Sequence, residues 1–115
     1  MTTNDFNKVI KDQINKCMDI LVGKAKEYAD NENDDRLHNF KCAAGLTGET
    51  PQAALAGMML KHTVSIYDMC KSKDNFPISL WEEKIGDHIN YLLLLKAAVV
   101  EEKIAGGVFN GNESD

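Results

Sequence analysis

The sequence predicts an all-α fold, a four-helix bundle-like single domain. Apolar residues recur every three or four positions in long segments, which is the spacing of one face of an α-helix. Capping residues, glycines and prolines separate these segments, and no segment alternates as a strand between hairpin turns does. A chain of 115 residues forms one core. We therefore expect one helical domain over residues 1–105 and a disordered, glycine-rich tail over 106–115.

The first helix is predicted from about Asn4 to Ala29. Its apolar positions are Phe6, Ile10, Ile14, Cys17, Leu21, Ala25 and Tyr28. Turn-forming residues at 30–34 then end the pattern. A short second helix begins near Asp34 or Asp35, whose side-chain oxygen can cap it, and ends at Gly45 and Gly48.

Two longer helices follow. Thr50 is a suitable N-cap and Pro51 a suitable first residue for a helix that runs to about Cys70. A polar loop precedes the last helix, whose opening residues Ser79 to Glu82 have the pattern of a capping box. This helix runs to about Ala105, where two glycines end it.

Composition excludes several classes of protein. The net charge of −5 argues against a nucleic-acid polymer as partner, because such proteins carry an excess of positive charge. The longest apolar run, residues 91–95, is too short to span a membrane, and the N-terminus has no signal-peptide core. Three widely spaced cysteines predict free, buried thiols. A cytoplasmic location, in a bacterium or a phage-infected host, is expected.

The apolar surface exceeds what one small bundle can bury. Residues 51–70 and 79–105 are apolar around much of the helix circumference. Self-association would cover the remainder, so we expect a homo-oligomer.

The last helix carries a polar cluster. Glu83, Asp87 and Asn90 are spaced i, i+4 and i+7, so they share one face. Carboxylates one turn apart are suitable ligands for Mg²⁺, which prefers oxygen. The alternative is an exposed face with ordinary helix charges.

A second cluster surrounds the first break in the helical pattern. Its members are Lys24, Lys26, Glu27, Tyr28, Asp34, Asp35, Arg36, His38 and Asn39. Glu27 and Asp35 could add carboxylates to the metal, while Lys24 or Arg36 could bind phosphate. The alternative is that Asp35 caps a helix and the other charges are solvated.

A third cluster lies on the helix over 51–70. Lys61 interrupts an apolar stretch, and burying its charge requires an anionic partner such as Asp68, Asp87 or a ligand phosphate. His62 lies on the side of the methionines, where a histidine packed in the core is the alternative to a ligand-binding one.

Residues 82–95, EEKIGDHINYLLLL, resemble the last metal-binding helix of the all-α nucleoside triphosphate pyrophosphohydrolases, the MazG-like superfamily. The segments KEYADNENDDRLHNF and KHTVSIYDM look like small phage and prophage proteins related to that group. The resemblance implies a dimer or tetramer that uses Mg²⁺ to split a nucleotide between its α- and β-phosphates. Glu83 and Asp87 would be the catalytic residues and metal ligands, with Glu27 and Asp35 as further metal candidates. The ligand-binding candidates are Lys24, Tyr28, Arg36, Asn39, Lys61, His62, Asn90 and Tyr91.

The chain departs from the family's acidic motifs. Lys24 to Glu27 replaces a glutamate-rich segment, and Lys84 replaces an expected acid. Two further functions therefore stay open. One is a non-catalytic nucleotide-binding protein that sequesters a nucleotide signal during phage infection, and the other is a helical protein-interaction module.

Overall fold

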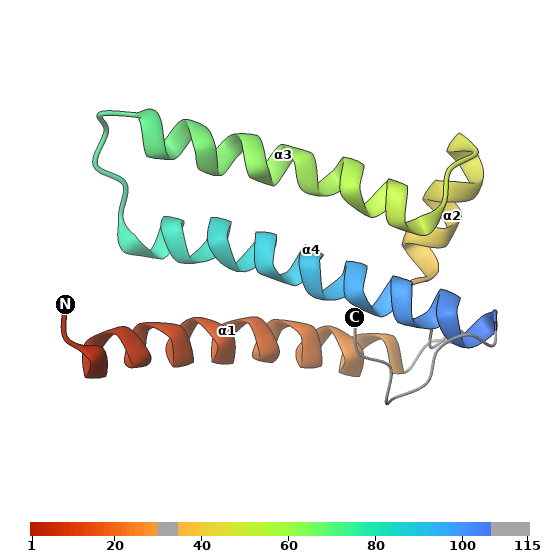
Figure 1. Ribbon diagram of the computed structural model, residues 1–115, viewed down its shortest axis with the longest axis horizontal. Helices are drawn as coiled ribbons and strands as arrows, with labels where there is room; N and C mark the ends of the chain where they lie inside the picture. The colour runs from red at the N-terminus through yellow and green to blue at the C-terminus, as the bar shows by residue number, and fades with distance from the viewer. Residues whose placement is uncertain (30–34, 107–115) are drawn as a thin grey trace.

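The described part of the chain is entirely helical (Figure 1). The computed structural model describes the backbone of residues 1–29 and 35–106, and the side chains of residues 1–23 and 35–106. It contains α1 (Thr3–Ala29), α2 (His38–Thr47), α3 (Pro51–Lys71) and α4 (Ile78–Ala105). The predicted all-α class and its helices are confirmed, and the predicted tail lies outside the described residues except for residue 106.

The ends of α2 follow local backbone chemistry. The helix begins at His38, three residues after the predicted Asp35, because the Asp35 carboxylate accepts a hydrogen bond from the Leu37 backbone N–H (2.9 Å) and forms a turn there. It continues through Gly45 and ends before Gly48, whose φ of 70° is the left-handed conformation that glycine adopts without strain.

The N-termini of α3 and α4 are formed differently. The Thr50 hydroxyl accepts a hydrogen bond from the Ala53 backbone N–H (3.2 Å), which confirms the predicted cap of α3. The predicted capping box of α4 is wrong. The helix begins at Ile78 after Pro77, so Ser79 lies inside the first turn and forms no cap.

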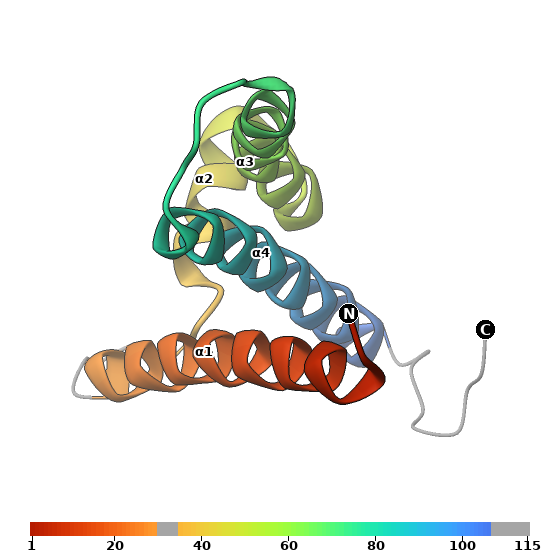
Figure 2. The same ribbon diagram turned by 90° about the vertical axis from the view of Figure 1, so that its left-hand side faces the viewer.

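The three long helices lie in order, with α4 between α1 and α3, and α2 packs against α3 at one end (Figure 1 and Figure 2). Leu37, Leu55 and Ala98 form the buried core, and the half-buried side chains of Phe40 and Tyr91 pack around it. Within the described residues, α1 contacts α4 but neither α2 nor α3 across a helix–helix interface. A closed four-helix bundle is therefore not confirmed.

The contact between α1 and α4 is close. The Cys17 thiol is buried there, and Lys16 forms an ion pair with Glu82 on the neighbouring turn. The other two cysteines, Cys42 and Cys70, are free but exposed, so their predicted burial is wrong. No described helix is long and apolar enough to cross a membrane.

One face of α1 leaves apolar side chains in solvent. Phe6, Ile10 and Ile14, spaced four residues apart, are all more than two-fifths exposed. The radius of gyration is 16.8 Å, whereas a compact domain of this length has about 13 Å. The single chain is thus more open than a closed bundle.

Candidate functional site

A cavity of about 140 Å³ lies between α1, α4 and the start of α2, and we call it the α2–α4 cavity. Its lining residues are Ile20, Leu21, Arg36, Asn39, Phe40, Asp87, Asn90, Tyr91 and Leu94. Five of these are sequence-predicted site residues, which come from two segments about fifty positions apart in the chain. The structure therefore brings together the polar face of α4 and the segment before and within α2.

The polar wall of this cavity comes from α4. Asp87, Asn90 and Tyr91 follow each other at helical spacing, which directs all three side chains to the same side. Asn90 is 7% exposed and is the only buried polar residue in the part of the chain that the structure describes. Its Oδ1 atom is shielded from solvent and accepts no hydrogen bond from any described residue.

A buried amide oxygen without a donor costs about 1–3 kcal/mol. Such groups are rare in folded proteins and often mark the place of a water or a ligand. The Asn90 side chain lines the cavity, so this buried amide is part of the cavity wall. This is the strongest sign that the cavity is a binding site.

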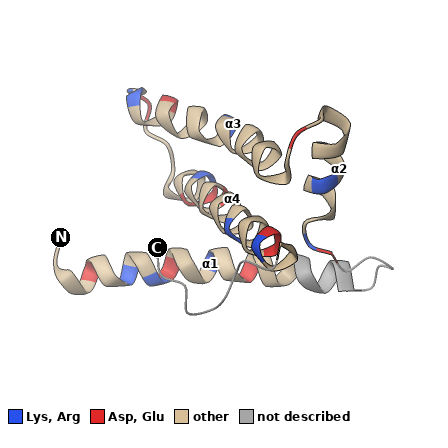
Figure 3. Ribbon diagram, turned by 45° about the vertical axis from the view of Figure 1, so that its right-hand side comes forward, with Lys and Arg blue, Asp and Glu red and all other residues tan. Residues whose placement is uncertain are grey.

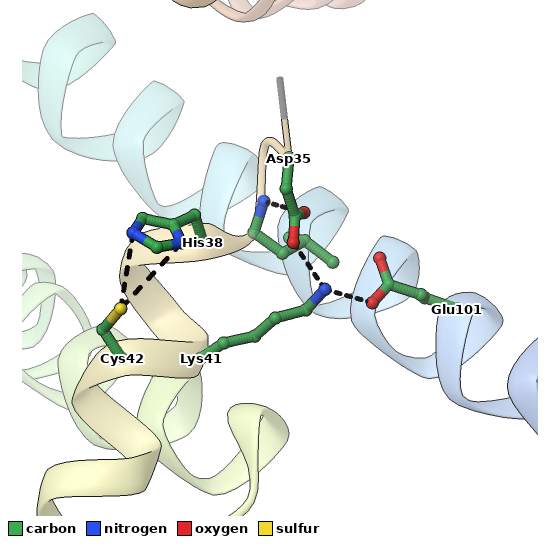
Figure 4. Close-up of polar contacts among 6 residues, drawn as sticks. Asp35, His38, Lys41, Cys42 and Glu101 are labelled. Atoms are coloured by element: carbon green, nitrogen blue, oxygen red, sulfur yellow. Dashed lines mark hydrogen bonds and ion pairs between the residues drawn. The ribbon is translucent and has the colours of Figure 1, made fainter. Parts of the chain in front are cut away.

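An ion-pair cluster outside this cavity joins the start of α2 to α4 (Figure 4). Lys41 Nζ donates to the Asp35 carboxylate (2.6 Å) and also forms an ion pair with Glu101 near the end of α4. The hydrogen bond from Lys41, followed by that from the Leu37 backbone, lowers the pKa of Asp35. The same pairing with Asp35 and then with Glu101 raises the pKa of Lys41. The cluster ties the turn that carries Arg36, and the start of α2, to α4.

This contact gives Asp35 a structural role. Its carboxylate lines neither the α2–α4 cavity nor the groove beside Glu83. The sequence predicted Asp35 as a metal candidate and, alternatively, as a capping residue. The geometry favours the structural interpretation, although the Asp35 carboxylate stabilises the turn before α2 and does not cap the helix itself.

Glu83 lies outside the cavity, in a neighbouring groove of about 360 Å³ between α1 and α4. Its side chain is exposed, whereas Asp87, one turn later, lines both the groove and the cavity. No three His, Cys, Asp or Glu side chains among those described are grouped to hold a metal ion. The predicted ligands Glu83 and Asp87 both line this groove, and no third such side chain among those described is grouped with them to hold a metal ion. Lys24, Glu27 and Tyr28 belong to the end of α1, where the side chains lie outside the description.

Lys61 and His62 lie in a different place from the other candidates. They line a groove of about 340 Å³ formed with residues of α2 and α4. Lys61 is exposed, and it is the only charged residue in the first seventeen positions of α3 (Figure 3). The His62 ring lies 4.9 Å from the Tyr91 ring, centroid to centroid. Tyr91 lines both the groove and the cavity, so it separates the two.

Sequence reasoning missed the apolar half of the cavity and the cluster around Lys41. Phe40 and Leu94 are ordinary core positions in the helical pattern, and no local signal separates a side chain that lines a cavity from one that fills a core. The pairing of Lys41 with Glu101 joins residues 60 positions apart. Only the packing of the helices brings these two together.

Comparison of the chain with protein-family models, with curated proteins and with solved structures finds no match. The resemblance to the MazG-like enzymes therefore stays a prediction, and the case for function depends on the cavity itself.

Proposed function

We propose that this chain binds a nucleotide in the α2–α4 cavity. The observation that carries the proposal is the buried Asn90 amide, whose oxygen has no donor among the described residues, on the wall of a cavity that also contains Arg36. A site with buried hydrogen-bonding groups on one side and a guanidinium on the other suits a ligand with a polar ring and an anionic group.

The other lining residues support a nucleotide over a simple anion. Phe40 and Tyr91 offer aromatic surfaces on which a base can stack. Arg36 has five N–H donors in a planar arrangement that matches phosphate oxygens. Asp87, in contrast, opposes a bare phosphate placed next to it.

Mg²⁺-dependent hydrolysis between the α- and β-phosphates is the catalytic form of this proposal. It requires more ligands than Glu83 and Asp87 provide, and Glu27 is the candidate for a third. When bound, Mg²⁺ would neutralise phosphate charge and lower the pKa of a bound water. The non-catalytic form, sequestration of a nucleotide signal, requires only the cavity.

One experiment tests binding and separates the two forms. Binding of ATP, GTP, CTP, UTP and their monophosphates is measured by calorimetry, with Mg²⁺ and with a chelator, and pyrophosphate release is followed in parallel. We expect micromolar binding of at least one nucleotide, weakened about 10-fold or more in Arg36→Met, because a hydrogen-bonded charge pair contributes about 1.5–3 kcal/mol. Lys73→Met, which removes the same charge from an exposed loop position, is the matched control.

The outcomes distinguish the hypotheses. Pyrophosphate release that is lost in Asp87→Asn identifies the hydrolase, and binding without release identifies the sequestering protein. If no nucleotide binds to the wild-type protein, the proposal is wrong and the protein-interaction module remains.

We also propose that the functional form is a homo-oligomer in which a second copy covers the apolar face of α1 defined by Phe6, Ile10 and Ile14. Their exposure and the open arrangement of the single chain support this. Apolar side chains in this number and spacing form the kind of stripe that packs against another helix. A second copy would supply the helix that closes the bundle on this side.

A further inference from the structure

We infer that the α2–α4 cavity recognises the base of its nucleotide through hydrogen-bond acceptors on α4, and that the base is guanine. This inference rests on the proposed function in its non-catalytic form. In this arrangement Asn90 and Asp87 bind the base, and the phosphates lie on the side of the cavity that contains Arg36.

The first step is the polarity of the buried group. Asn90 Oδ1 is an acceptor, and it lies out of solvent with no donor among the described residues. Phosphate groups are mostly fully ionised at neutral pH, so their oxygens act as acceptors and do not satisfy it. The complementary group is therefore an N–H or O–H on the uncharged part of the ligand. A nucleotide satisfies this requirement when its base, and not its phosphate, meets Asn90.

The second step is the neighbouring carboxylate. Asp87 lies three residues before Asn90 on the same helix and lines the same cavity. An ionised carboxylate only accepts hydrogen bonds, so this wall presents two acceptors side by side. Its negative charge also keeps phosphate groups away.

The third step compares the bases. Guanine carries two adjacent donors, the ring N1–H and the 2-amino group, beside the O6 acceptor that the Asn90 amide nitrogen can bind. Adenine and cytosine each offer one amino group, and uracil offers one ring N–H. Guanine alone can satisfy Asn90 Oδ1 and the Asp87 carboxylate through neighbouring groups on one edge.

The cavity is larger than a single water requires. The cavity volume of about 140 Å³ is several times the share of one liquid water, about 30 Å³. Phe40 and Tyr91 add aromatic surfaces beside the acceptors. Single bases held in this way, by stacking and by contacts to one edge, are common in proteins that read unpaired nucleotides.

The test compares guanosine monophosphate with inosine monophosphate, which lacks only the 2-amino group, and with adenosine monophosphate. Binding to the full-length protein is measured by calorimetry in the presence of a chelator. We expect guanosine monophosphate to bind at least 10-fold more tightly than either of the others. Asp87→Ala should reduce the ratio between guanosine and inosine monophosphates to about one, and Asn90→Leu should weaken both at least 10-fold. Asp74→Ala, which removes a carboxylate from an exposed loop position, should keep the ratio.

Circular dichroism melting of each variant shows whether it is folded. If Asn90→Leu does not fold, Asp87→Ala, at a half-buried position, still tests the inference. Equal binding of guanosine and inosine monophosphates, or a requirement for Mg²⁺, overturns the inference while the proposed function stands. Failure of all nucleotides to bind the wild-type protein overturns the proposed function itself.

Discussion

The Cys17 thiol lies 3.8 Å from the backbone carbonyl oxygen of Gly86, at the point where α1 crosses α4. A Cβ atom at residue 86 would lie 3.0 Å from Gln13 Nε2 and 3.9 Å from Cys17 Sγ. The absence of a side chain at Gly86 therefore lets the two helices approach. Because α1 contacts no other described helix, this crossing determines where the α1 wall of the cavity lies.

Side chains of increasing size at residue 86 should first be tolerated and then separate the helices. In Gly86→Ala the end of the flexible Gln13 side chain can move away, and alanine favours the helix by about 1 kcal/mol, so stability should change little. Gly86→Val adds methyl groups against α1 and should lower the free energy of unfolding by about 1–3 kcal/mol. Urea denaturation measures both. Gly57→Val controls for the helix propensity of valine, because a Cβ atom at residue 57 would meet no neighbouring atom within 4 Å. Equal losses of unfolding free energy at the two sites would contradict this role of Gly86.

The core is small, so a single leucine should dominate it. Leu55 is 1% exposed and packs with Leu37 and Ala98. Leu55→Ala should lower the free energy of unfolding by about 2–5 kcal/mol, since it leaves a cavity among these side chains. Leu60→Ala removes the same group from a position on α3 that is 61% exposed, and it should cost less than about 0.5 kcal/mol. Thermal and urea unfolding of the pair decides whether the core lies where the structure has it.

Stability should fall on acidification through Asp35. Pairing with Lys41 lowers the pKa of this carboxyl in the folded state, so the folded protein binds the proton less readily than the unfolded chain does. The stabilisation is complete above the unfolded pKa of about 4 and is lost as the pH falls through the lower folded value. The raised pKa of Lys41 affects stability at alkaline pH. Its contribution is present below about pH 10.4 and is lost as the pH rises through the folded value.

Asp35→Asn tests this dependence. The amide still accepts from the Leu37 N–H but carries no charge, so the difference in unfolding free energy from the wild type should be present at pH 7 and shrink as the pH falls below about 4. Asp74→Asn, at an exposed loop position, removes the same formal charge and should not reproduce that difference. A pH-independent difference between Asp35→Asn and the wild type would show that the ion pair is not the cause.

A charge on the exposed face of α1 should dissociate the proposed oligomer. Ile10→Asp places a carboxylate at the centre of the Phe6–Ile10–Ile14 stripe, and burying that charge against a second copy is unfavourable. Sedimentation velocity should show the wild type as a dimer or larger and Ile10→Asp as a monomer. Leu46→Asp, at an apolar position of α2 that is 89% exposed, should keep the wild-type mass. A monomeric wild type at tens of micromolar would refute the oligomer.

Asn90 should reduce the stability of the ligand-free protein. Its buried oxygen lacks a donor among the described residues, so Asn90→Leu removes a buried polar group that has no hydrogen-bond partner there. Replacing such a group with an apolar one is neutral or favourable, and we expect melting of the ligand-free variant to show a gain of up to about 1 kcal/mol. Asn39→Leu changes an exposed amide at the same cavity and should have little effect. A large loss in Asn90→Leu would instead indicate a structural hydrogen bond.

The helices themselves could be predicted from residue order because their signals are local. The three-to-four-residue apolar period, the Thr50 cap with Pro51 and the glycine at position 48 act within one or two turns. Pro77 and Ser79 are competing signals for the first residue of α4. The sequence pattern predicted a start at Ser79, whereas the helix begins directly after Pro77. The shared face of Asp87 and Asn90 was equally readable, since helix geometry fixes it.

The sequence by itself determined the helical class, the approximate helix boundaries and the grouping of polar residues on α4. Only the tertiary structure decided that Asp87, Asn90 and Tyr91 meet Arg36 and Asn39, whereas Lys61 and Glu83 lie in separate grooves. The physical reason is that helix formation depends on near neighbours, while a cavity depends on which helices pack together. That choice is made by buried contacts between distant residues, such as Cys17 with Gly86 and Lys41 with Glu101, whose pairing leaves no periodic trace in the chain.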